Sequence, residues 1–243
     1  GSYAIDFDAF EAAITQRTRI FILCNPHNPV GRLWSEAELH AVAEICSSHE
    51  VAVVADEIHA DLTLDGRAFT PFARAATGTD VLWAAIHGPI KSFGLAGVCD
   101  TLLSTDSAQL AGRFREMSSR LHLTRNNVFG LAALDAAYRT GADWLDSLLA
   151  LVSRNLRTLS EGLDERIPVI EPEATYLAWI DLRHLGLDAP ELAGWLADAG
   201  LALSPGHWFG REGAGFARMT IAAPEAEIAE ATERLNRAIA DIG

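Results

Sequence analysis

The chain has 243 residues, 49% of them hydrophobic, which suffices for one large domain or roughly one and a half domains. Its 33 Asp and Glu residues outnumber its 19 Lys and Arg residues, and the net charge of −14 argues against general affinity for nucleic acid or for anionic membranes. The three cysteines stand far apart without a metal-binding pattern, and no apolar run approaches the roughly 20 residues that span a bilayer. We therefore expect a cytoplasmic protein with reduced thiols and no metal.

The first half of the chain alternates short apolar runs with amphipathic helices. This pattern predicts an α/β fold with a mostly parallel sheet that is covered on both faces. Ser35 and Glu38 form a capping box at the start of one helix. The predicted elements are a helix at 8–17, a strand at 20–25, a helix at 35–49 and strands at 51–56, 81–86 and 101–105.

The second half of the chain is first helical and then mixed, which predicts a smaller α+β domain at the C-terminus. The predicted elements are helices at 108–122, 127–141 and 143–165, a strand at 174–183, a helix at 189–199, a strand at 216–223 and a helix at 225–242. We divide the chain into a partial large domain (3–140), an interdomain helix (141–165) and a small domain (166–243).

The predicted sheet of the large domain has only three or four strands, whereas an average sheet has about five or six. Such a small sheet would leave its edges and one face exposed. We therefore expect either that sequence is missing at the N-terminus or that a partner completes the sheet.

Polar side chains follow three of the predicted strands. Asn28 lies in "NPHNPVG", Asp56 and His59 lie in "ADEIHADL", and Lys91 lies in "PIKSFGLAG". In open α/β sheets, ligands bind beyond the carboxyl ends of the strands. Each residue alone has an ordinary explanation, as a turn, a helix cap, a core histidine or a solvated lysine. Their joint occurrence favours a functional site.

These motifs, together with "NVFGLAALDAAY", "ATYLAWIDLR" and "FARMTIA", resemble those of fold-type I pyridoxal-phosphate (PLP) enzymes. Within the class I/II aminotransferases, the sequence is most similar to the carbon–sulfur lyase branch, the MalY/PatB-type cystathionine β-lyases. The resemblance covers nearly the whole chain and implies the aspartate aminotransferase fold, with a large domain that lacks its N-terminal part. It also implies a homodimer with an amino acid as substrate.

The resemblance implies a role for each of five residues. Lys91 would form the Schiff base with pyridoxal 5'-phosphate and move the substrate Cα proton. Asp56 would pair with the pyridine nitrogen, and Asn28 would hydrogen-bond the phenolic oxygen of the cofactor. His59 would lie beside the cofactor, where many aminotransferases carry a tyrosine. Arg218 would bind the substrate α-carboxylate, with Asn28 beside it.

The sequence departs from the family at three positions near Lys91. The family commonly places hydroxyl or other polar residues there to hold the cofactor phosphate, and this chain has Gly88, Ile90 and Cys99. With these departures and the missing N-terminal part, affinity for PLP could be low or nil. His87 could partly substitute as a phosphate ligand.

Several functions follow from this resemblance. The first is a PLP-dependent C–S β-lyase that acts on cystathionine-like cysteine S-conjugates and yields pyruvate, ammonia and a thiol. The second is an aminotransferase, and the third is a truncated or degenerate homologue without activity of its own. An effector domain of a bacterial regulator is a further alternative. Tyr176, Trp208 and Phe209 are candidates for a side-chain pocket, or else belong to the core of the small domain.

Overall fold

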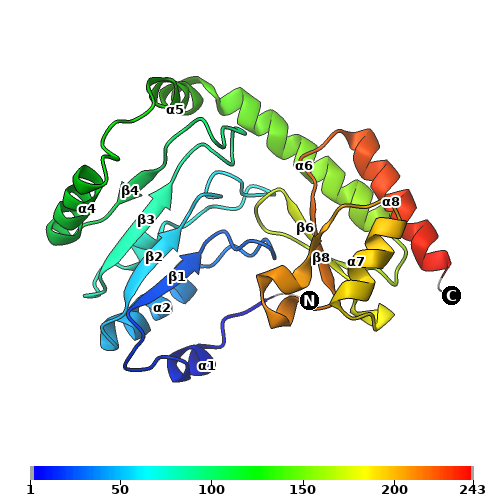
Figure 1. Cartoon of the computed structure of the whole chain (residues 1–243), viewed down its shortest axis with the longest axis horizontal. Helices are drawn as coiled ribbons and strands as arrows, with labels where there is room; N and C mark the ends of the chain where they lie inside the picture. Colours follow the sequence, from blue (N-terminus) through cyan, green and yellow to red (C-terminus); the bar gives the residue numbers. More distant parts are fainter. Residues whose placement is uncertain (1–2, 242–243) are drawn as a thin grey trace.

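The computed structural model describes residues 3–241, so the last residues of the predicted C-terminal helix and small domain, 242 and 243, lie outside it. The chain forms two four-stranded sheets, which are joined by the long helix α6 (Ala142–Gly162). In Figure 1 the first sheet lies on the left and the second on the right, and α6 runs between them along the top.

The first sheet has three parallel strands and an antiparallel edge strand. In spatial order its strands are β1 (Ile20–Cys24), β2 (Ala52–Asp56), β3 (Trp83–His87) and β4 (Leu102–Ser104). The predicted capping box is present at the start of α2 (Glu36–Ser48), where Ser35 and Glu38 satisfy each other's backbone N–H groups. The mostly parallel sheet is therefore as predicted.

Only one face of β1 is covered. Phe21 and Leu23 pack with α2 and with α3 (Phe72–Ala75) in the core of this sheet. Because side chains alternate along a strand, Ile20 and Ile22 point to the opposite face. Their exposed fractions are 59% and 71%. The expectation of a sheet covered on both faces is therefore wrong for β1, because no described helix reaches these two side chains.

Helix α1 (Phe7–Ala12) is shorter than the predicted helix 8–17. Beyond it, the backbone N–H of Thr15 donates to Thr18 Oγ1 at 3.0 Å. Threonine side chains compete in this way with the hydrogen bonds of a helix, and the chain turns toward β1. Two further helices, α4 (Ala108–Arg120) and α5 (Val128–Thr140), follow β4 near the predicted positions.

The second sheet is antiparallel and has helices on one face. Its strands in spatial order are β5 (Val169–Ile170), β6 (Leu177–Asp181), β8 (Phe216–Thr220) and β7 (Ser204–Pro205). Helices α6, α7 (Ala189–Asp198) and α8 (Glu225–Ala240) bury their apolar residues against Ala178 and Ile180 of β6. Alternation then places Trp179 and Arg218 on the other face of this sheet, away from the helices.

The two halves are connected by backbone hydrogen bonds around Gly31. The N–H groups of Glu173 and Ala174 both donate to the Gly31 carbonyl, at 2.8 and 3.0 Å. The Thr175 N–H donates to the carbonyl of Leu62 at 2.7 Å. Since backbone bonds of this kind fix both position and direction, they hold the start of the second sheet against the loops of the first.

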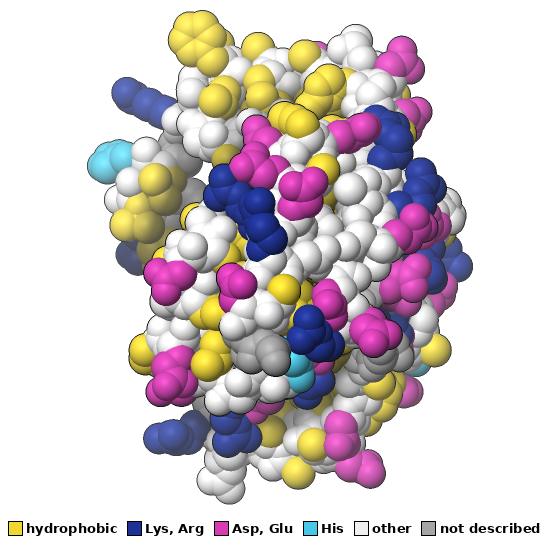
Figure 2. Space-filling view, turned by 90° about the vertical axis from the view of Figure 1, so that its right-hand side faces the viewer, with side chains coloured by type: hydrophobic (Ala, Val, Ile, Leu, Met, Phe, Trp, Pro, Cys, Tyr) yellow, Lys and Arg dark blue, Asp and Glu magenta, His cyan; other side chains and the backbone are white. Residues whose placement is uncertain are grey.

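The surface carries charges of both signs. Figure 2 shows a face on which basic and acidic side chains are interspersed, without a continuous basic area. Among residues 3–241, no helix is long and apolar enough to cross a membrane.

The junction at Gly31 generates a stability prediction. Gly31 and Gly66 both have a φ of +70°, but a Cβ on Gly31 would collide with Pro172, whereas a Cβ on Gly66 would meet open space. We expect Gly66→Ala to lower the free energy of unfolding by about 1 kcal/mol, from backbone strain alone. Gly31→Ala should lower it by about 3 kcal/mol, because overpacking is added to the same strain.

Urea unfolding of the two variants and the unsubstituted chain measures the difference directly. Equal losses of stability in Gly31→Ala and Gly66→Ala would contradict the importance of the Gly31 junction.

Candidate active site

Parallel pairing brings the ends of three strands to one edge of the first sheet. Cys24 pairs with Asp56, and Asp56 pairs with Ile86 on β3. The segments that follow these strands carry the predicted site residues Asn28, His59 and Lys91. The register therefore places these segments side by side, as the sequence analysis predicted.

His59 lies among the charged groups of this site. Its side chain is buried, and its Nδ1 atom has no hydrogen-bond partner among the described residues. Burial, the positive charge of Lys91 and that of Arg218 lower the pKa of His59 to about 4, against the opposing effect of Asp56. His59 is therefore a neutral imidazole near pH 7, and the charges of three other predicted site residues act on it.

Arg218 reaches this site from the second sheet. Its Nη1 donates to Asn28 Oδ1 at 2.9 Å, and its Nη2 donates to Ser204 Oγ at 3.2 Å. Partial burial lowers the pKa of Arg218 from its usual value, although a guanidinium stays protonated in proteins. The two residues that the resemblance implies for carboxylate binding, Arg218 and Asn28, are thus in direct contact.

Tyr176 packs against His59 at the entrance to β6. The two rings are 5.8 Å apart between centroids and meet edge to face at 71°. Burial raises the pKa of Tyr176, while Arg218 acts in the opposite direction. Of the three aromatic candidates, Tyr176 therefore borders the site, whereas Trp208 is 69% exposed and is not part of the core.

The turn that carries Lys91 is anchored by the two residues that follow it. Ser92 is buried and donates its hydroxyl to Asp61 Oδ2 at 2.7 Å. The Phe93 ring stacks on Trp144 of α6 with 5.5 Å between centroids. Within residues 3–241, Lys91 Nζ has neither a hydrogen-bond nor an ion-pair partner, so a fixed backbone presents an unengaged amine.

The buried Glu57 and the partly exposed His87 form a pair that the sequence analysis did not predict. Glu57 Oε1 accepts from the Phe72 N–H at 2.6 Å, and its Oε2 lies 2.5 Å from His87 Nε2. The hydrogen bond to Glu57 raises the pKa of His87, against the opposing effect of partial burial. Because Nε2 of His87 is engaged with Glu57, only Nδ1 of this ring is left for a phosphate, and a role of His87 in phosphate binding stays a prediction. No spacing in the sequence indicates that these two residues meet.

Ser204 and Asp61 are two further contact residues that sequence reasoning missed, whereas Phe209 was one of the three aromatic candidates. Ser204 and Phe209 both touch Arg218, and Asp61 holds the residue next to Lys91. Their positions depend on which loops the fold brings together. Only the hydroxyl of Ser92, directly beside Lys91, could have suggested an anchor.

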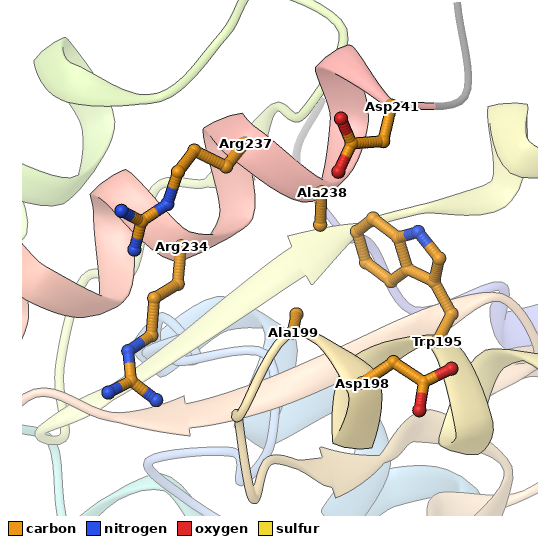
Figure 3. A pocket seen from close by; sticks show the side chains of 7 residues that line it. All are labelled: Trp195, Asp198, Ala199, Arg234, Arg237, Ala238 and Asp241. Atoms are coloured by element: carbon orange, nitrogen blue, oxygen red, sulfur yellow. The ribbon is translucent and has the colours of Figure 1, made fainter.

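The cavity in Figure 3 is a separate feature. It has a volume of about 460 Å³, lies between α7 and α8, and contains none of the predicted site residues. Arg234, one of its two arginines, is engaged by Glu230 and by the Gly200 carbonyl, and the side chains of Asp198 and Asp241 add acidic groups to its wall. The convergent groups around His59 are therefore better suited to chemistry than this cavity.

Comparison with known proteins identifies relatives of this chain. The protein PatB of Bacillus subtilis (strain 168), a cystathionine β-lyase, is 34% identical over 98% of this chain and 63% of its own length. The protein MalY of Escherichia coli (strain K12) is 32% identical over 96% of this chain and 61% of its own length. This chain therefore spans about three fifths of the length of these relatives.

The structure also superimposes on that of cystalysin from Treponema denticola, which contains a pyridoxal 5'-phosphate cofactor. The TM-score is 0.91, the sequence identity is 29%, and the alignment covers 100% of this chain and 63% of cystalysin. This likeness confirms the predicted PLP-transferase-like fold, of which this chain represents a part. The sequence matches the family described as "Aminotransferase class I and II" over residues 1–235. The chain belongs to this family.

Proposed function

We propose that the protein is a PLP-dependent carbon–sulfur β-lyase that acts on cystathionine-like cysteine S-conjugates. The observation that carries this proposal is that Asp56 and the segments with Asn28 and Lys91 follow adjacent parallel strands at one edge of the first sheet, where Arg218 is hydrogen-bonded to Asn28. The lyase names of the most similar relatives support the choice of reaction class.

The groups present in the site fit such a cofactor. The unpartnered Nδ1 of His59 and the unengaged amine of Lys91 are polar groups without protein partners among residues 3–241. Asp56 uses Oδ1 to accept from the Ile58 N–H at 3.2 Å, which leaves its other oxygen for a ligand. A carboxylate, an amine, an imidazole and a guanidinium match the ring nitrogen, the aldehyde, the ring edge and the substrate carboxylate.

Each residue then has a defined task. Lys91 would hold the aldehyde through Nζ and would afterwards take the substrate Cα proton. Asp56 would hold a proton on the pyridine nitrogen through its negative charge. Arg218 would bind the α-carboxylate, and Asn28 would orient both Arg218 and the cofactor edge. When bound, the cofactor supplies an electron-accepting ring that stabilises negative charge developing at Cα.

The proposed elimination needs no reactant other than the amino-acid substrate and water. The Cα–H bond breaks with its proton going to Lys91, and the Cβ–S bond breaks with its electron pair leaving on the thiolate. The remaining three-carbon enamine takes up water and gives pyruvate and ammonia. An aminotransferase is the second candidate, because it needs the same deprotonation by Lys91. In that reaction the Cβ–S bond stays intact, the proton is returned, and a 2-oxo acid has to accept the amino group. A homologue without activity of its own is the third.

Lys91 offers an unusually clean test because it is the only lysine in the sequence. We expect added PLP to give a visible absorption band, and borohydride reduction to fix the cofactor on the peptide that contains Lys91. Lys91→Ala should remove both signals, since the other basic residues are arginines, which do not condense with the aldehyde.

Trp208→Ala, which alters an exposed side chain in the 3-10 turn Gly206–Phe209, is the matched control and should keep both signals. An absorption band that survives Lys91→Ala, or modification confined to the N-terminal amine, would contradict the role of Lys91. No band in the unsubstituted chain at saturating PLP would favour a homologue that is inactive by itself.

The departure at Ile90 generates a prediction about cofactor affinity. Family members commonly have a hydroxyl residue one position before the lysine, where Ile90 has only carbon atoms. Position 88 is less suitable for a substitution, because a Cβ on Gly88 would lie 3.3 Å from Thr101 Cγ2. We expect Ile90→Ser to lower the Kd for PLP about tenfold, since a hydrogen bond to a charged group contributes roughly 1.5–3 kcal/mol.

Ile90→Ala separates the hydroxyl from the loss of the isoleucine side chain and should give no such gain. The measurement is an absorbance titration with PLP. If Ser and Ala at position 90 bind PLP equally, a hydroxyl at this position does not help to hold the phosphate.

We also infer that the protein is a homodimer in which α4 lies at the interface. Helix α4 contains no buried residue, although Phe114 and Met117, with Leu121 just beyond, form an apolar stripe at helical spacing. These three side chains are 49%, 53% and 59% exposed. Together with Leu123 and Thr124 of the following loop, they border a groove of about 570 Å³. A two-fold dimer would bury such a stripe against its own copy.

We expect light scattering to give a mass of twice 26.2 kDa for the unsubstituted chain. Phe114→Asp with Met117→Asp should shift it to the monomer, because two charges would have to be buried. Trp208→Asp places a charge on an exposed aromatic position elsewhere and should leave the dimer intact. A dimer that survives the double substitution would place the interface away from α4.

A further inference from the structure

The position of the Arg218 guanidinium is set by more than its hydrogen bonds. Its Cζ atom lies 4.7 Å from the centroid of the Phe209 ring, within the range of a cation–π interaction. Asn28 and Ser204 accept from its two terminal nitrogens. The group is thus contacted on its face by an aromatic ring and on its edge by two oxygen atoms.

These contacts leave enough donors for a carboxylate. A guanidinium has five N–H groups, and the bonds to Asn28 and Ser204 use one on each terminal nitrogen. Three N–H groups remain, which is sufficient for a bidentate pair with an α-carboxylate. Because a ring on the face takes none of these donors, Phe209 can restrain the plane of the guanidinium without competing for the ligand.

Phe209 is itself held by a stack of aromatic rings. It meets the buried Trp179 edge to face at 5.7 Å, and Trp179 stacks on Phe216 with an interplanar angle of 6°. Trp179 is also the cross-strand partner of Arg218, so the two side chains leave the same face of the second sheet. The stack therefore fixes Phe209 relative to the strand that carries Arg218.

The loop that carries Phe209 is tightly packed at its base. A Cβ on Gly206 would overlap with the Gly213 carbonyl, and a Cβ on Gly213 would overlap with the Gly206 carbonyl. The 3-10 turn Gly206–Phe209 lies between these glycines and directs Phe209 inward, while Trp208 is 69% exposed. Adjacent residues of one turn thus differ sharply in their surroundings.

We propose that Phe209 is a positioning residue, whose ring holds the Arg218 guanidinium flat and partly dry for the α-carboxylate of an amino-acid substrate. This inference rests on the proposed function, in which Arg218 binds that carboxylate. A guanidinium that is already oriented loses less side-chain conformational freedom when the carboxylate binds. Where it is partly shielded from water, its N–H groups also meet less competition from water for the carboxylate.

The test measures carboxylate binding without requiring turnover. The Nε–H signal of Arg218, assigned by its loss in Arg218→Lys, is followed by NMR during titration with acetate. We expect Phe209→Ala and Phe209→Leu to weaken the fitted affinity about three- to thirtyfold, and Phe209→Tyr to retain it. Trp208→Ala, the control from the same turn, should bind acetate as the unsubstituted chain does.

The Leu and Tyr variants decide between positioning by an aromatic face and simple packing. Acetate affinity in Phe209→Leu equal to that of the unsubstituted chain would overturn the proposal, and so would a loss in Phe209→Tyr as large as in Phe209→Leu. If Phe209→Ala does not fold, as judged by circular dichroism, the Phe209→Leu and Phe209→Tyr variants still test the proposal.

A second measurement uses the PLP-loaded protein. There, Phe209→Leu should raise the KM for a cysteine S-conjugate more than it lowers kcat, and an unchanged KM would overturn the proposal. The trapping experiment on Lys91 does not involve Phe209. Failure of that experiment would remove the proposed lyase activity, whereas failure of the acetate titration would remove only the role of Phe209.

Discussion

The hydrogen bond between Arg218 and Asn28 is the contact on which the candidate site depends. Arg218 belongs to a strand of the second sheet, and Asn28 follows the first strand of the first sheet, 190 residues earlier in the chain. The bond is short, charge-assisted and partly buried, so losing one partner would leave the other without compensation in a poorly solvated place. The backbone bonds at Gly31, three residues from Asn28, hold the same two regions together.

A second constraint is the balance of charge around His59. Two positive groups, Lys91 and Arg218, and one negative group, Asp56, act on a buried imidazole. Burial already disfavours a charged histidine, and the two cations add to this effect. The neutral ring is thus subject to charges of both signs without adding a charge of its own. His59 Nδ1 has no hydrogen-bond partner among the described residues. Buried polar atoms are normally hydrogen-bonded, so such an atom is expected where a ligand supplies the missing partner.

Much of the first sheet could be predicted from the sequence, because its apolar runs and the capping box at Ser35 are local signals. The parallel strands and the helix α2 therefore appear close to their predicted positions. The predicted helix 8–17 was too long, because two threonines form local hydrogen bonds that no periodicity records. Full cover of both faces was wrong at Ile20 and Ile22. An apolar run indicates what a strand can bury, but not which element lies over it.

The candidate site, like the fold, was predicted only in part from the sequence. The sequence by itself indicated Asn28, Asp56, His59, Lys91 and Arg218, because residue types at strand ends and a family resemblance are visible in one dimension; their chemical roles stay predictions. Only the tertiary structure decided that Arg218 contacts Asn28 and that Phe209 covers the guanidinium. It alone paired His87 with Glu57 and anchored the lysine turn through Ser92 and Asp61. The physical reason is that these contacts join segments whose approach is set by packing of the two sheets, and hydrogen bonds and ring contacts depend on distances that no spacing in the sequence encodes.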